Sequence, residues 1–83
     1  MKIHIRYFAS LREALGPGES FDVAEGTTLG GLRAMLVARG GRHAEALGAQ
    51  RPLRSALNQV MAADTAPLAP GAEVAFFPPV TGG

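Results

Sequence analysis

Hydrophobic and polar positions alternate at the start of the chain. Ile3, Ile5 and Tyr7 hold every second position, and lysine, histidine and arginine stand beside them. This two-residue period is typical of a half-buried strand and predicts a strand over Lys2–Phe8. The same alternation sends Phe8 to the open side of that strand, together with the polar residues.

A helical period appears in the middle of the chain. Leu29, Leu32 and Leu36 are spaced so that they share one face of a helix. We expect this helix to be capped at its N-terminus within Thr27–Thr28 and to stop at Gly40–Gly41. It is the main helix that the sequence predicts.

Shorter elements lie between these two. The segment Ser10–Leu15 is predicted to form a brief helical turn, with Ser10 as its N-cap and Gly16–Gly18 as its stop. Phe21 and Val23 are separated by one polar residue, which indicates a short second strand.

The second half of the chain has weaker signals. Residues 42–52 are expected to form an irregular connection, with a possible helical turn over Ala44–Leu47. Leu53–Met61 is apolar enough for a third strand, and the proline-containing stretch Asp64–Pro67 ends it. Glu73–Phe77 alternates again and is predicted to be the last strand.

The predicted order is therefore strand, strand, helix, strand, strand. One helix on one face of a small mixed sheet is an α+β arrangement, and it fits a β-grasp (ubiquitin-like) fold with the first and last strands adjacent in the middle. With 83 residues, 47% of them hydrophobic and 18% charged, the chain suits one small domain. We expect this domain to span residues 1–77, followed by an extended, flexible tail over residues 78–83.

Composition excludes several classes of function. The chain has no cysteine, so disulfides and thiolate metal sites are impossible, and a net charge of +1 gives little support to nucleic-acid binding. No phosphate loop or serine-hydrolase elbow occurs, and His4 and His43 are expected to be solvated. Without a signal peptide or an apolar run of about 20 residues, the expected location is the cytoplasm, with no membrane association.

The tail has the features of a projecting chemical handle. Pro78 and Pro79 cannot donate hydrogen bonds to a sheet and favour an extended chain that leaves the domain. The six residues of the tail reach roughly 20 Å, enough to enter another protein's pocket. Gly82 and Gly83 lack a Cβ and fit a narrow channel. The carboxylate of Gly83, once adenylated by ATP, would accept sulfur, nitrogen or oxygen nucleophiles; a disordered, inert end is the alternative.

Two aromatic residues are expected beside the base of this tail. Alternation in the last strand places Val74 and Phe76 in the core and turns Phe77 outward, as the first strand does for Phe8. Adjacent exposed aromatic side chains next to a projecting end indicate a docking surface. A register slip or bulge that buries Phe8 or Phe77 is the alternative.

Three segments resemble a known family. Y-F-A-S-L-R-E (Tyr7–Glu13), A-L-N-Q (Ala56–Gln59) and above all E-V-A-F-F-P-P-V-T-G-G (Glu73–Gly83) are similar to the MoaD family, the small sulfur-carrier subunit of molybdopterin synthase. Related carriers such as ThiS share the Gly-Gly end but usually lack the Phe-Phe-Pro-Pro run. One departure is Ala72, where the family pattern often has an acidic residue.

The resemblance implies a cycle with several partners and no permanently bound cofactor. A MoeB-like adenylyltransferase would use ATP to adenylate Gly83, and a sulfurtransferase or cysteine desulfurase system would supply sulfur for a C-terminal thiocarboxylate. The tail would then enter a MoaE-like large subunit and give sulfur to cyclic pyranopterin monophosphate during molybdenum cofactor biosynthesis. The implied assembly is a heterotetramer, in which this chain is a non-catalytic, sulfur-donating subunit.

The resemblance also assigns partner-binding positions. Phe8, Met61 and Phe77 match the apolar contact with the activating enzyme, and for Met61 the resemblance is the only support. Arg12 matches a position that helps partner docking, although an exposed arginine is often only solvated. Three other functions stay open: a ThiS-like carrier for thiazole or another sulfur metabolite, a ubiquitin-like modifier that acylates lysines, and a binding domain with an inert tail.

Overall fold

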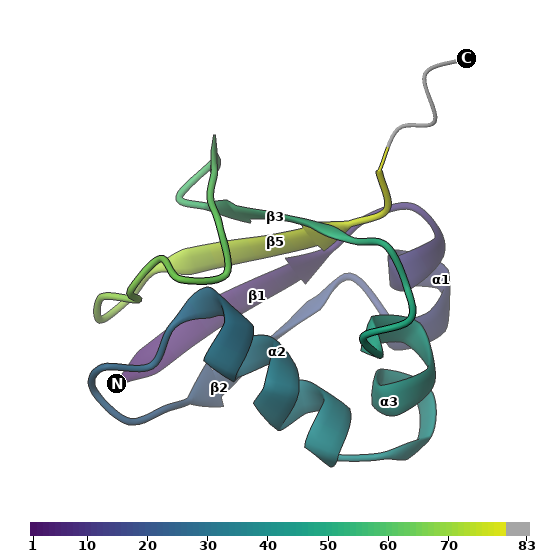
Figure 1. Cartoon of the computed structure of the whole chain (residues 1–83), viewed down its shortest axis with the longest axis horizontal. Helices are drawn as coiled ribbons and strands as arrows, with labels where there is room; N and C mark the ends of the chain where they lie inside the picture. The colour runs from purple at the N-terminus through teal and green to yellow at the C-terminus, as the bar shows by residue number, and fades with distance from the viewer. Residues whose placement is uncertain (80–83) are drawn as a thin grey trace.

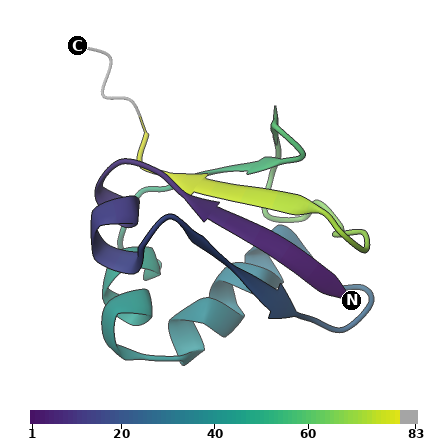
Figure 2. The same cartoon turned by 180° about the vertical axis from the view of Figure 1, so that it is seen from behind.

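The computed structural model describes residues 1–79 of the chain. Within them a five-stranded mixed sheet has the strand order β2-β1-β5-β3-β4, with helices packed on it (Figures 1 and 2). The elements in chain order are β1 (Lys2–Tyr7), α1 (Ser10–Leu15), β2 (Gly18–Asp22), α2 (Leu29–Ala38), α3 (Gly41–Leu47), β3 (Arg54–Leu57), β4 (Val60–Met61) and β5 (Glu73–Phe77). The first and last strands lie side by side in the middle, as the sequence predicted.

Strands β1 and β5 run parallel and supply the centre of the core. Tyr7 is paired with Phe76, and their rings stack with centroids 6.5 Å apart. Ile3, Ile5 and Val74 point to the same side and are buried, which confirms the predicted alternation. The helices cover this side of the sheet (Figure 1), and we call the other side the open face.

Helix α2 is the main helix and begins as predicted. The Thr28 hydroxyl accepts a hydrogen bond from the Gly31 amide at 3.1 Å, and Leu29, Leu32 and Leu36 are buried. Gly30 opens the helix against the backbone of Asp64, to whose carbonyl its amide donates at 2.9 Å. A Cβ at residue 30 would lie 3.1 Å from the Asp64 Cβ, so the glycine that weakens the helix also permits this approach.

Helix α1 has the predicted span but not the predicted cap. Its N-cap is Ala9, at a φ of 53°, and no side chain accepts a hydrogen bond from the first turn, so the assignment of Ser10 as N-cap is wrong. Leu11 instead anchors the helix in the core. Gly16, at a φ of 89°, ends the helix in a backbone conformation that glycine adopts without strain.

The third predicted strand is a hairpin. β3 and β4 pair antiparallel around Asn58 and Gln59, which have φ values of 49° and 69°. Two central residues with positive φ are the mark of a tight hairpin turn that favours Asn followed by Gly. The Asn58 side chain also accepts a hydrogen bond from the Glu73 amide at 2.9 Å, which fixes the turn against β5.

The connection predicted over residues 42–52 is partly helical. Helix α3 covers Gly41–Leu47, a longer span than the single turn expected there, and Leu47 is buried in the core. The Arg33 guanidinium donates to the carbonyls of Leu47, Gly48 and Arg51 at 2.7, 2.8 and 3.0 Å. A side chain of α2 therefore holds the end of α3 and the turn that leads into β3.

Candidate functional site

The described chain ends at the edge of the sheet where β1 and β5 both finish. Pro78 and Pro79 follow β5 directly and are half-buried. Tyr7 is paired with Phe76, and the Phe8 amide donates to the Phe76 carbonyl at 3.2 Å, so the chain leaves β1 at the same level. The predicted tail residues Gly82 and Gly83 lie outside the described residues.

Phe8 and Phe77 lie next to this exit. Phe8 is 39% exposed, and Phe77 is half-buried at the end of β5. Because Phe76 faces the core, its neighbour Phe77 points to the open face, directly opposite Arg54 of β3. The ladders run without a bulge through this region, so neither aromatic residue is turned into the core.

Met61 belongs to the same face, for a reason that the sequence reading missed. Ala56 is paired with Met61 on one side and with Ala75 on the other, and Ala75 is in turn paired with Arg6. Paired residues of neighbouring strands point to the same side of a sheet, so Met61 faces the same way as Arg6 and Ala75. Its side chain is 53% exposed. Asn58 was the available signal, because a hairpin turn there fixes this register.

Arg12 lies on α1 and is exposed. Among residues 1–79, no hydrogen bond, ion pair or cation–π contact joins it to Phe8, Met61 or Phe77. The structure thus brings three of the predicted docking residues to one face and leaves Arg12 on a helix beside it.

A groove runs along the helical side of the tail's base. Its volume is about 650 Å³. Its walls come from α1, from α3, from the segment before β3 and from the two prolines. The lining residues are Ser10, Leu11, Glu13, Ala14, Arg42, Glu45, Ala46, Arg51, Pro52, Leu53, Pro78 and Pro79. The prolines therefore have the open face on one side and a mixed apolar and charged groove on the other.

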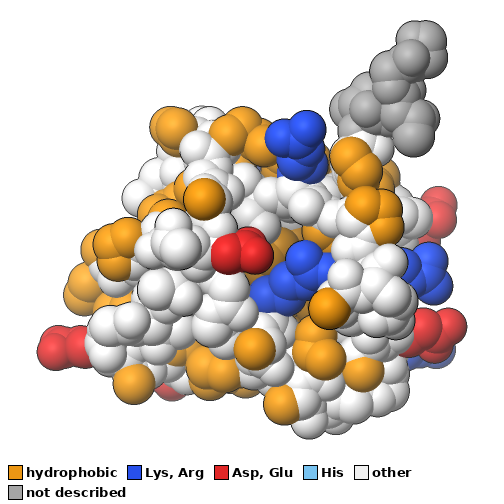
Figure 3. Space-filling view, viewed as in Figure 1, with side chains coloured by type: hydrophobic (Ala, Val, Ile, Leu, Met, Phe, Trp, Pro, Cys, Tyr) orange, Lys and Arg blue, Asp and Glu red, His pale blue; other side chains and the backbone are white. Residues whose placement is uncertain are grey.

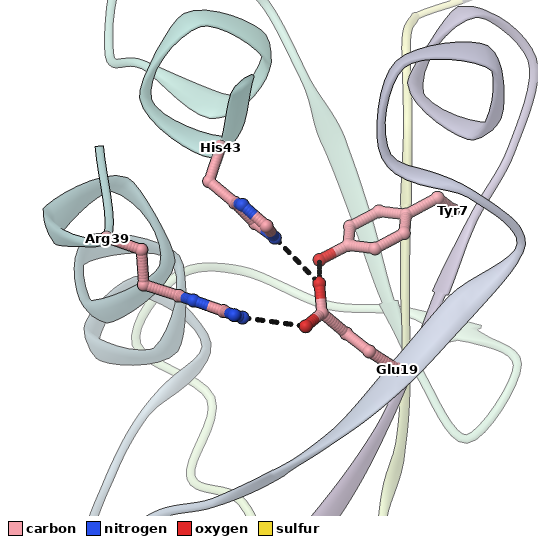
Figure 4. Close-up of polar contacts among 4 residues, drawn as sticks. All are labelled: Tyr7, Glu19, Arg39 and His43. Carbon is pink, nitrogen blue, oxygen red and sulfur yellow. Dashed lines mark hydrogen bonds and ion pairs between the residues drawn. The ribbon is translucent and has the colours of Figure 1, made fainter. Parts of the chain in front are cut away.

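A polar cluster lies on the helical side of the sheet (Figure 4). Both oxygens of the Glu19 carboxylate are bonded: Oε2 accepts from Tyr7 Oη and His43 Nε2, each at 2.8 Å, and Oε1 accepts from Arg39 Nη1 at 2.7 Å. The expectation that His43 is a solvated loop residue is therefore wrong, because its side chain is 20% exposed on α3 and bonded to β2. His4 is exposed, as predicted.

The environment of this cluster shifts two pKa values. Burial raises the pKa of Glu19, but the hydrogen bonds from its three partners outweigh burial, and the pKa of Glu19 lies below its ordinary value. Burial, reinforced by the hydrogen bond to Glu19, raises the pKa of Tyr7 above its ordinary value. The carboxylate thus stays charged and links β2 to β1, α2 and α3. It is a structural contact rather than a second reactive site.

Residues 1–79 contain neither a metal-binding cluster nor a membrane-spanning helix. Over residues 1–79, no three histidine, aspartate or glutamate side chains come together in a way that would hold a metal ion. None of the helices found there has the length and apolar character needed to span a bilayer.

Comparisons with known proteins identify relatives of the whole chain. A model described as the ThiS family matches residues 5–83. The "Molybdopterin synthase sulfur carrier subunit" of Escherichia coli (strain K12) is 41% identical over 81 residues, covering 98% of this chain and 99% of the relative.

Solved structures give the same fold. Small archaeal modifier protein 1 of Haloferax volcanii is 28% identical with a TM-score of 0.78, covering 95% of this chain and 98% of the other. A chain from the complex of subunits 1 and 2 of the molybdopterin-converting factor from Helicobacter pylori 26695 is 27% identical with a TM-score of 0.70, and both chains are covered completely. These likenesses confirm the predicted β-grasp fold.

Proposed function

The chain belongs to the ThiS family, and we propose that it serves as the sulfur-carrier subunit of a molybdopterin synthase. The observation that supports this most directly is the 41% identity to the E. coli carrier over nearly the full length of both chains. The open face agrees with it, since Phe8 and Phe77 lie beside the point where the tail leaves the sheet and Met61 is exposed on the same face.

In the proposed reaction the carboxylate of Gly83 is the group that changes. Its oxygen attacks the α-phosphate of ATP on a MoeB-like adenylyltransferase, pyrophosphate leaves, and an acyl-adenylate forms. The terminal sulfur of a persulfide on a sulfurtransferase or cysteine desulfurase then attacks the activated carbonyl, displaces AMP and forms an acyl disulfide. A thiol of the donor system reduces the S–S bond of this intermediate and leaves as a disulfide. The product is a thiocarboxylate on Gly83, a better nucleophile than the carboxylate.

Delivery depends on a second partner. The loaded tail enters the active site of a MoaE-like large subunit, where the sulfur passes to cyclic pyranopterin monophosphate. Two sulfurs are needed for each product, so two loaded carriers are consumed. In the proposed heterotetramer, this chain lends its C-terminus and contributes no catalytic side chain. Pro78 and Pro79 stiffen the base of the arm that reaches the partner.

The amino-acid composition suits a carrier that holds sulfur on its main chain. Without a cysteine, no internal thiol can attack the activated glycine or trap the sulfur as a disulfide. The domain can therefore be adenylated repeatedly without capturing its own activated end through sulfur.

Mass spectrometry of the intact chain tests the proposal. After incubation with the adenylating enzyme, ATP and a sulfur source, we expect a mass gain equal to the replacement of one oxygen by sulfur at Gly83. A chain that lacks Gly83 is the control: it should melt at the same temperature as the wild type and gain no sulfur. An unchanged wild-type mass with every component present would refute the carrier function, as would loading of the shortened chain.

Two related functions are tested by the same reagents. The likeness to small archaeal modifier protein 1 favours a protein modifier as the second candidate, and the ThiS family also fits a carrier for thiazole or another sulfur metabolite. A modifier would form isopeptide conjugates of higher mass on target proteins, visible on a blot. Recovery of the large subunit from cell extract by a tagged chain would favour molybdopterin synthesis over both.

A further inference from the structure

Two arginines flank the apolar docking residues of the open face. Arg6 of β1 is paired with Ala75 of β5, and on the other side of β5 Arg54 of β3 is paired with Phe77. All four residues point to the open face, because Tyr7 and Phe76 beside them face the core. The central strand therefore has one arginine on each side at its tail-proximal end.

Both guanidinium groups are available for a partner. Arg6 and Arg54 are exposed, and the ion pairs found in residues 1–79 involve neither of them. Arg6 lies over the ring of Phe8, with its Cζ 5.6 Å from the ring centroid, so this charge is held beside an apolar group. A space-filling view shows a basic side chain among hydrophobic ones at the upper rim, close to the base of the tail (Figure 3).

The acidic strand residues of this face lie at its other end. Asp22 is paired with Lys2, and Glu73 is paired with His4. These two carboxylates lie at the end of the sheet remote from the tail. Among strand residues of the open face, the tail-proximal half carries arginine without a neighbouring carboxylate, so the face is polarised along the strands.

A shallow hollow joins Arg54 to Met61. Its volume is about 290 Å³, and Asp64 is one of its lining residues but forms no ion pair with Arg54. A partner side chain placed there would contact the apolar thioether of Met61 and the guanidinium of Arg54 together. The hollow thus places an apolar side chain and a guanidinium group next to each other on the open face.

We propose that the open face recognises a protein surface whose apolar centre is flanked by carboxylate groups, and that Arg6 and Arg54 select such partners. This rests on the proposed function, because the first partner in question is the adenylating enzyme. Charges at the rim of an apolar contact mainly raise the rate of association and exclude wrong partners by repulsion. The aromatic residues provide the apolar contact area, and the two arginines discriminate between partners with and without nearby carboxylates.

The test is the association rate of the unloaded chain with its adenylating enzyme, measured without ATP or sulfur at increasing NaCl. We expect Arg6→Glu and Arg54→Glu each to slow association about ten-fold at low salt and to flatten its salt dependence. Two charge-matched controls are Lys2→Glu, at the far end of the same face, and Arg42→Glu, on α3. Each control should change the rate less than about three-fold, since only the net charge is altered.

Different outcomes separate the inference from the function on which it rests. Equal effects of all four substitutions, or a wild-type rate that does not change with salt, would overturn the role of Arg6 and Arg54 while leaving sulfur loading intact. A wild-type chain that binds no adenylating enzyme would overturn both proposals. Preferential binding to vesicles of anionic lipid would show that a membrane surface is the partner and would also overturn this inference. Arg6→Gln and Arg54→Gln, expected to have smaller effects of the same sign, replace any reversed variant that fails to fold.

Discussion

The Nε2 atom of His43 lies 2.8 Å from Oε2 of Glu19, and this contact joins helix α3 to strand β2. Because the hydrogen bonds to Glu19 lower its pKa, the charged carboxylate stabilises the fold. We expect Glu19→Gln to lower the free energy of unfolding at pH 7 by about 1 to 2 kcal/mol, a typical loss for hydrogen bonds to a charged group. Urea unfolding measures this difference.

The pH dependence of the same variant has a definite sign. A carboxyl group with a lowered pKa contributes stability above its unfolded pKa, about 4.3, and loses it as the pH falls through the folded pKa. The gap between wild type and Glu19→Gln should therefore narrow as the pH falls below about 4.3. Glu25→Gln, at an exposed turn, is the matched control and should change stability little at any pH. A gap that widens at acid pH would contradict this account.

Phe76 and Phe77 are neighbours with opposite roles. Phe76 is fully buried against Tyr7, so Phe76→Ala should cost about 3 to 5 kcal/mol of folding free energy. Phe77 lies on the open face, so Phe77→Ala should weaken binding to the adenylating enzyme by more than it weakens folding. Thermal melts and binding isotherms of both variants check the ranking, and the reverse order would remove Phe77 from the docking face.

Strand β4 offers two neighbouring residues for a matched test of the open face. Val60 and Met61 are both exposed, but Met61 points to the open face and Val60 to the opposite side of the sheet. We expect Met61→Ala to weaken partner binding several-fold and Val60→Ala to leave it unchanged. Both should fold normally, because neither side chain is buried. Equal effects on binding would show that the sheet face does not distinguish them.

The β3–β4 turn contains a strained residue that substitution can relieve. Gln59 has a φ of 69°, a region that glycine occupies freely. Gln59→Gly should therefore raise the free energy of unfolding by about 0.5 kcal/mol, with Gln59→Ala as a control that keeps the strain. Urea denaturation distinguishes the two, and a destabilised glycine variant would mean that the Gln59 side chain has a stabilising role.

Local sequence patterns were sufficient to predict the central strands and the main helix of this fold. Alternation over Lys2–Phe8 and Glu73–Phe77 gave both central strands and the direction of Phe8 and Phe77, because side-chain direction along a strand depends only on its period. The leucines of α2 gave the main helix in the same way. These signals lie within single segments and need no knowledge of distant contacts.

Features that depend on distant residues were not predictable in this way. His43 is half-buried and bonded to Glu19, a residue far away in sequence, and no local pattern indicates that pairing. The hairpin was missed because Gln59 replaces the glycine that usually marks such a turn. Serine is a favoured N-cap residue, but Ala9 occupies the N-cap position of α1, and no side chain accepts a hydrogen bond from the first turn. In each of these cases the observed structure depends on contacts between residues that are distant in sequence or on the local backbone conformation.

The position of β5 between β1 and β3 determines how the domain resists mechanical force applied at its C-terminal side. Force applied at Pro79 along the strand direction loads the hydrogen bonds to both neighbours simultaneously, in shear, so they must fail together rather than one after another. A partner that draws on Pro79 therefore acts on a strand that is hydrogen-bonded along both of its edges. A pull on the C-terminal side of β5 therefore leaves the domain folded as long as these two sets of hydrogen bonds hold.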